Sequence, residues 1–107
     1  MERDPNMRLK PLAPQEVVEA KRELIPDVVI ETFNTLLAER ATNGYATIYQ
    51  DEVVAQLEEQ GLVRQDIYAR HWLDVEPLYR ESGWKVEYDK PGYNETYRAF
   101  FRFSVPR

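Results

Sequence analysis

Few side chains in this sequence could act in catalysis. The single histidine, His71, lies in a stretch with a helical pattern, where a packing or surface role outweighs a role as base or metal ligand. The acidic pairs Asp51–Glu52 and Glu58–Glu59 cannot chelate a metal alone, because neighbouring residues of a helix point in different directions. The four glycines form no phosphate-binding loop. We therefore expect a protein that is not an enzyme and that uses no metal or cofactor.

Basic side chains gather in two segments and raise the hypothesis of nucleic-acid binding. Arginine suits phosphate and guanine because its guanidinium donates two parallel hydrogen bonds. The candidates are Arg64, Gln65, Arg70 and His71 in the first segment, and Lys85, Lys90, Arg98 and Arg102 in the second. Carboxylates lie among them at Asp66, Asp74, Glu76, Glu81, Glu87 and Asp89. Such a mixture neutralises the cations and repels phosphate, which weakens this hypothesis.

Aromatic side chains support an alternative, a protein interface. The chain has seven tyrosines, four phenylalanines and two tryptophans. Phe100 falls on the otherwise polar face of its expected strand, and Tyr93 falls within a turn. Exposed aromatics surrounded by polar residues are typical anchors of protein interfaces. A Tyr93 folded back over its turn, or a singly exposed Phe100, would need no such role.

Prolines and apolar spacing divide the first half of the chain. Residues 1–13 hold two prolines and no regular period, so we expect a loose N-terminal arm before one folded domain over residues 14–107. A short helix is expected over residues 15–24, with an apolar side formed by Val17, Val18 and Leu24. A second helix should start near Pro26, which lacks an N–H, and end at Asn43–Gly44. Its apolar stripe is Val29, Phe33, Leu36 and Leu37.

Shorter elements follow in the middle of the chain. Pro77 cannot lie deep within a helix, so we expect Asp74 to cap a separate helix that Gly83 ends. The expected elements are a strand of three or four residues within 45–49, a helix from Gln50 or Asp51 to Gly61 with Val53, Val54 and Leu57 in the core, a helix around 67–72, and a helix over 75–82.

The C-terminal residues 84–105 alternate with the period of two that is typical of strands, and they predict a hairpin. We expect Tyr88 to pair with Tyr97 or Ala99, which would place Arg98 opposite Glu87 or Asp89. The shared apolar face is Trp84, Val86 and Tyr88 on the first strand, and Tyr97, Ala99, Phe101, Phe103 and Val105 on the second.

This order of elements predicts an α+β domain and, more narrowly, a winged helix in which the short strand joins the hairpin as a third member. In that fold the helix before the hairpin can enter the major groove of DNA, while the hairpin, or wing, contacts the backbone or minor groove. The rival expectation is a generic α+β domain whose small antiparallel sheet packs on helices.

Composition limits the classes of protein that fit. With 107 residues, 43% hydrophobic and 31% charged, the chain is expected to be one globular domain without a membrane span. Its start lacks the apolar core of a signal peptide. The absence of cysteine rules out disulfides and thiolate zinc sites, and a reducing cytoplasm is the default expectation. The net charge of −5 opposes indiscriminate binding to phosphate backbones. Residues 1–61 carry a net −6 and residues 62–107 a net +1, so the hairpin half is nearly neutral.

Four runs of sequence resemble a recurrent family of small tailed-bacteriophage proteins. The runs are Ile25–Glu31, Tyr49–Val54, Trp72–Glu76 and Gly83–Glu95, and the resemblance covers roughly residues 25–105. It implies expression in the cytoplasm of an infected bacterium, or presence in the virion, but it carries no catalytic or binding residue. The first 24 residues lie outside it and are expected to form an arm specific to a partner.

These observations predict a non-enzymatic accessory protein that binds a macromolecule, first of all a protein of the host or phage. A DNA-binding winged-helix regulator using the same helix and wing is the alternative. A continuous positive face would favour DNA, whereas interrupting carboxylates with Tyr93 and Phe100 exposed together would favour protein. The expected binding surface is Arg64, Arg70, Lys90, Tyr93, Arg98 and Phe100.

Overall fold

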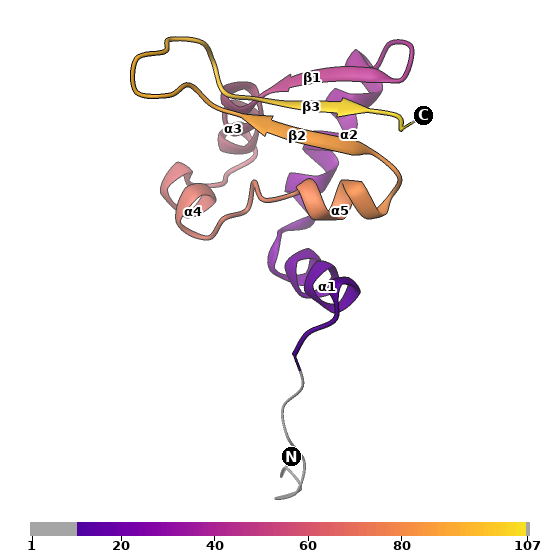
Figure 1. Cartoon of the computed structure of the whole chain (residues 1–107). Helices are drawn as coiled ribbons and strands as arrows, with labels where there is room; N and C mark the ends of the chain where they lie inside the picture. Colours follow the sequence, from indigo (N-terminus) through magenta and orange to yellow (C-terminus); the bar gives the residue numbers. More distant parts are fainter. Residues whose placement is uncertain (1–10, 107) are drawn as a thin grey trace, which may run out of the picture.

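The computed structural model describes residues 11–106, which form an α+β fold (Figure 1). The described part has five helices and one three-stranded antiparallel sheet, as the sequence predicted. Residues 1–10 of the expected arm lie outside the described residues. The elements are α1 (Pro14–Leu24), α2 (Asp27–Arg40), β1 (Tyr45–Tyr49), α3 (Gln50–Glu59), α4 (Arg64–Ala69), α5 (Glu76–Glu81), β2 (Lys85–Asp89) and β3 (Phe100–Ser104).

The sheet has the strand order β1-β3-β2, so the short strand does join the C-terminal hairpin. The predicted register of that hairpin is wrong, because Tyr88 lies beside Phe101 and Glu87 lies beside Arg102. A slip of two residues keeps every side chain on its own face, so alternation alone cannot distinguish these pairings. The faces of the residues paired within β2 and β3 were therefore predicted correctly, while the strands pair further from the turn than expected. The prediction is wrong for Tyr97 and Val105, which lie just outside β3 and are 38% and 55% exposed instead of sharing its apolar face. Tyr97 packs beside Phe100.

The core lies between the helices and one face of the sheet. Phe33 of α2 makes an edge-to-face contact with Phe101 of β3, with ring centroids 5.1 Å apart. The predicted stripe of α2 is buried throughout, as are the core positions predicted in α3. The sheet contributes Ala46, Ile48, Val86, Phe101 and Phe103.

The first helix departs from its predicted packing. No residue of α1 is fully buried, and Leu24 is 73% exposed instead of forming part of an apolar side. Ile25, one residue beyond the helix, is buried in its place. The chain turns at Ile25 into extended backbone, and this turn directs Ile25 rather than Leu24 toward the core.

Helix α4 begins and ends earlier in the chain than predicted, and α5 is shorter than predicted. His71 has a positive φ of 55°, so the chain leaves the helical conformation and Trp72 lies outside α4. Asp74 makes no capping hydrogen bond, because Val75 occupies the cap position of α5. Gly83 ends this segment with a φ of 105°, as its residue type predicted. Similarly, Tyr49 rather than Gln50 or Asp51 lies at the cap of α3.

Candidate binding surface

The sheet face that points away from the core is open, and it carries a row of aromatic side chains at its edge. The residues of this open face are Tyr45, Thr47 and Tyr49 of β1, Phe100, Arg102 and Ser104 of β3, and Lys85, Glu87 and Asp89 of β2. The register places Tyr49 and Asp89 on either side of Phe100. The alternation that placed Phe100 on the polar face is therefore confirmed.

Phe100 is not a free anchor, because neighbouring side chains cover part of its ring. Its centroid lies 6.4 Å from that of Tyr49 and 6.3 Å from that of Tyr97. The guanidinium of Arg102 lies 5.3 Å from the same ring, and that of Arg98 lies 3.9 Å from the ring of Tyr49. Phe100 is accordingly half-buried. The open face thus presents an aromatic cluster with two cations stacked on it.

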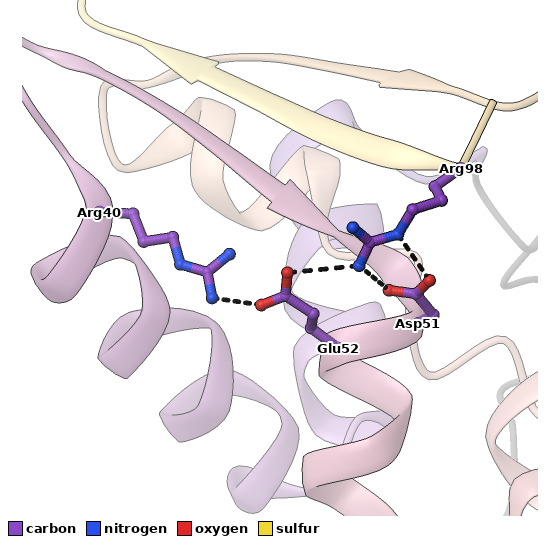
Figure 2. Close-up of polar contacts among 4 residues, drawn as sticks. All are labelled: Arg40, Asp51, Glu52 and Arg98. Carbon is purple, nitrogen blue, oxygen red and sulfur yellow. Dashed lines mark hydrogen bonds and ion pairs between the residues drawn. The ribbon is translucent and has the colours of Figure 1, made fainter.

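Arg98 connects this cluster to α3 through a network of ion pairs (Figure 2). Its Nε lies 2.8 Å from Oδ2 of Asp51, and its Nη2 lies 2.6 Å from Oδ1, a bidentate contact. The same Nη2 is 3.4 Å from Oε1 of Glu52, whose other oxygen accepts a hydrogen bond from Arg40 of α2. The expected pairing of Arg98 with Glu87 or Asp89 is wrong, because the loop before β3 directs Arg98 toward α3.

Hydrogen bonds within the network shift the pKa values of its members in the direction that favours their charged forms. The hydrogen bond from Arg98 lowers the pKa of Asp51 below its ordinary value, and burial opposes it. The hydrogen bond from Arg40 lowers the pKa of Glu52 in the same way. Hydrogen bonding to Asp51 in turn raises the pKa of Arg98. All four groups are therefore ionised at neutral pH, and the guanidinium of Arg98 is occupied within the molecule.

The loop between β2 and β3, residues 90–99, is closed at its base and presents Tyr93 at its tip. The hydroxyl of Tyr97 lies 2.7 Å from both Oδ1 of Asp89 and the carbonyl oxygen of Lys90, so it shares its proton between two acceptors. Its hydrogen bond to Asp89 raises the pKa of Tyr97 to about 12. Within the loop, the amide of Gly92 donates to Glu95 at 2.9 Å. Tyr93 is 101% exposed, which confirms the prediction of an aromatic at the tip.

The predicted cations of α4 and the strands are mostly paired with carboxylates. Arg64 contacts Glu58 at 2.8 Å, and Arg70 lies 3.9 Å from Asp66. On the open face, Lys85 and Arg102 both approach Glu87, at 3.7 Å and 3.9 Å. Among residues 11–106, Lys90 is the one candidate of the predicted surface that is positively charged and makes no ion pair within 4.0 Å. Carboxylates thus interrupt the positive face that would favour DNA.

The structure brings the predicted residues into three groups rather than one. Arg98 and Phe100 share the aromatic cluster, Lys90 and Tyr93 share the loop 90–99, and Arg64 and Arg70 belong to α4 and its end. The predicted surface did not include Tyr49 or Asp51, and Tyr97 was predicted on the apolar core face instead of beside Phe100. The alternation of β1 already placed Tyr49 opposite its buried neighbours, whereas the partners of Arg98 carried no local signal.

Three further findings concern membrane-spanning helices, metal-ligand clusters and similarity to known proteins. Across residues 11–106, no helix combines the length and apolar character needed to cross a membrane. The same residues contain no group of three or more histidine, cysteine, aspartate or glutamate side chains suited to a metal ion. Comparisons with protein-family models, curated proteins and solved structures found no match.

Proposed function

We propose that this protein is a non-enzymatic accessory module, winged-helix-like in topology, that binds another protein through the loop 90–99 and the adjoining open face. The observed order of helices and strands and the strand order β1-β3-β2 support the winged-helix proposal. The resemblance of its sequence to small tailed-phage proteins supports a phage origin, with a partner from the host or the phage.

The observation that carries this proposal is the combination of a fully exposed Tyr93 with neutralised cations. Tyr93 extends from a loop whose base is closed by hydrogen bonds from Tyr97, which limit the conformations open to the ends of that loop. The aromatic cluster of the open face lies at the start of β3, next to that loop. Tyrosine in such a setting is a common anchor of protein interfaces. The ion pairs around it leave few cations for phosphate groups.

The alternative is a DNA-binding regulator that uses α4 and the loop 90–99. Two observations favour it. Lys90 makes no ion pair among the described residues, and Arg70 is held only loosely, 3.9 Å from Asp66. Lys90 belongs to the loop that would act as the wing. Arg70 lies at the end of α4, whereas α5 is the helix that directly precedes the hairpin. Against it, Glu58 and Asp66 accompany the cations of α4 and its end, and Glu87 accompanies those of the open face, so phosphate would meet carboxylates at both places.

A salt series separates the two functions. A duplex DNA probe titrated with the protein at low salt should show no binding, because the cations that could contact phosphate are mostly neutralised.

In a crosslinking experiment with bacterial extract, the wild type should form a discrete, saturable complex that Tyr93→Ala weakens about tenfold or more. Thr96→Ala in the same loop serves as the matched control and should retain the complex. Tight DNA binding that weakens steeply with salt would overturn the proposal.

A further inference from the structure

A second surface lies on the other side of the molecule, where α1, α2 and the α5 region line a groove of about 540 Å³. Figure 1 shows α1 and α5 far from the loop 90–99, so this groove is separate from the surface proposed above. It is open to solvent and is not a closed cavity. Its lining is Val18, Glu19, Arg22 and Glu23 from α1, Ile30 and Asn34 from α2, and Leu78, Tyr79, Glu81 and Ser82 from the α5 region.

The lining combines an apolar bottom with a negative margin. Ile30, Leu78 and Val18 are half-buried and Tyr79 is buried, with its hydroxyl donating to Asn34 at 2.6 Å. The three carboxylates, Glu19, Glu23 and Glu81, are exposed.

The only cation of the lining does not offset this charge. The guanidinium of Arg22 donates to Asp27 at 2.7 Å and to the carbonyl of Ile25 at 3.4 Å. Its charge is therefore matched by a carboxylate outside the groove. Three carboxylates of the margin remain without a neutralising cation among the lining residues.

We infer that this groove docks a basic amphipathic segment of a partner protein, with apolar side chains against the bottom and Lys or Arg side chains against the margin. An apolar bottom with exposed carboxylates complements such a segment in both shape and charge. An open groove suits a chain segment better than a small ligand, which pockets usually bury on most sides. The weak packing of α1, which buries no residue fully, leaves this wall of the groove free to adjust.

The test uses three synthetic helical peptides of equal length. The first has leucine at the helical spacing i, i+3, i+4, i+7 and lysine elsewhere; the second replaces its lysines with glutamate, and the third replaces its leucines with serine. Binding to the full chain is followed by fluorescence anisotropy, and the contacted amides are mapped by two-dimensional NMR. The Leu/Lys peptide should bind at least about tenfold more tightly than either of the others. The shifted amides should belong to α1, Ile30 and residues 78–82.

Matched variants separate the groove from general attraction between an acidic protein and a basic peptide. Glu19→Lys with Glu23→Lys should weaken binding of the Leu/Lys peptide about tenfold. The control is Glu39→Lys with Glu59→Lys, which changes two exposed carboxylates outside the groove. It has the same net charge as the groove variant, −1 instead of −5. Binding of the Leu/Lys peptide to this control should change less than about twofold. Four outcomes would each overturn the inference. They are equal weakening by both double variants, equal binding of all three peptides, no binding of the Leu/Lys peptide at low salt, and shifted amides confined to the loop 90–99.

Discussion

At the scale of single residues, Arg98 has the most consequential contacts of the candidate surface. It covers the ring of Tyr49 and forms the bidentate contact with Asp51, and it thereby joins the loop 90–99 to the first turn of α3 (Figure 2). The side chains of Arg98 and Asp51 are 51% and 59% exposed, so solvent screens part of their attraction. We therefore regard Arg98 chiefly as a residue that positions the loop, and only secondarily as a source of stability.

The first prediction concerns how the stability of the protein changes at acidic pH. A carboxylate whose pKa is lowered in the folded state stabilises the protein above its unfolded pKa, and that stabilisation is lost as the pH falls through the folded pKa. Arg98→Ala removes the main cause of the lowered pKa of Asp51. The variant should have a lower Tm than the wild type at pH 7, and the difference should shrink below about pH 4. Thermal unfolding monitored across a pH series measures this, and a difference independent of pH would contradict it.

At the scale of elements, the short helices α4 and α5 depend on packing and on special backbone positions. Each has six residues, fewer than an isolated helix needs in water. Ile67 anchors α4 and Tyr79 anchors α5 in the core. The positive φ of His71 and of Gly83 ends the respective segments. These turns and anchors, together with the positive φ of Gly61 and the buried Val75, hold the path of the chain between α3 and β2.

The second prediction tests one of these turns. A Cβ at Gly83 would meet no atom within 4 Å, so Gly83→Ala changes the backbone preference without a steric clash. Since the φ of 105° disfavours an L side chain, the variant should lose about 1–2 kcal/mol of unfolding free energy. Urea unfolding measures the loss. The neighbouring Ser82→Ala is the control, with a φ of −77° and an expected change within about 0.5 kcal/mol. Equal stability of both variants would show that the turn tolerates Cβ.

At the scale of the whole molecule, one core joins the layers, and each edge strand has one position whose outward backbone groups are occupied. Phe33 contacts the rings of Tyr79 at 6.1 Å, Phe101 at 5.1 Å and Phe103 at 6.3 Å, so it links α2 to α5 and the sheet. At the edges, Arg80 donates to the carbonyl of Val86 in β2, and Thr42 forms a bridge with Tyr45 at the start of β1. Edge groups occupied in this way are less available for pairing with another chain.

The third prediction compares two apolar residues at opposite ends of the burial scale. Phe33 is 0% exposed, so Phe33→Ala should cost about 3–5 kcal/mol through lost burial and a residual cavity. Leu24 is 73% exposed, so Leu24→Ala should change the unfolding free energy by less than about 0.5 kcal/mol. Urea and thermal unfolding with a near-ultraviolet circular dichroism signal report both. A cost for Leu24→Ala comparable to that for Phe33→Ala would contradict the observed packing of α1.

Local periodicity by itself determined the buried stripe of α2 and the faces of the residues within β2 and β3, and residue type determined the turn at Gly83. These features follow from side-chain spacing and from the backbone preference of glycine, which act over a few residues. The predicted end of α2 was wrong, because the helix ends at Arg40 and Asn43–Gly44 forms the turn that pairs Thr42 with Tyr45. The place of Tyr93 at the tip of the loop also followed from the sequence, whereas its full exposure, rather than a side chain folded back over the turn, came from the structure.

Only the tertiary structure decided the hairpin register, the partner of Arg98, the packing of α1 and the groove between α1, α2 and α5. A two-residue slip leaves the alternation unchanged, so the register depended on how the sheet packs on the helices. Arg98 and Asp51 are 47 positions apart, and no local pattern relates them. The groove joins residues of α1 to residues near α5, far apart in the chain. Contacts of this kind arise when separate elements meet around a shared core, and the sequence of each element alone does not contain them.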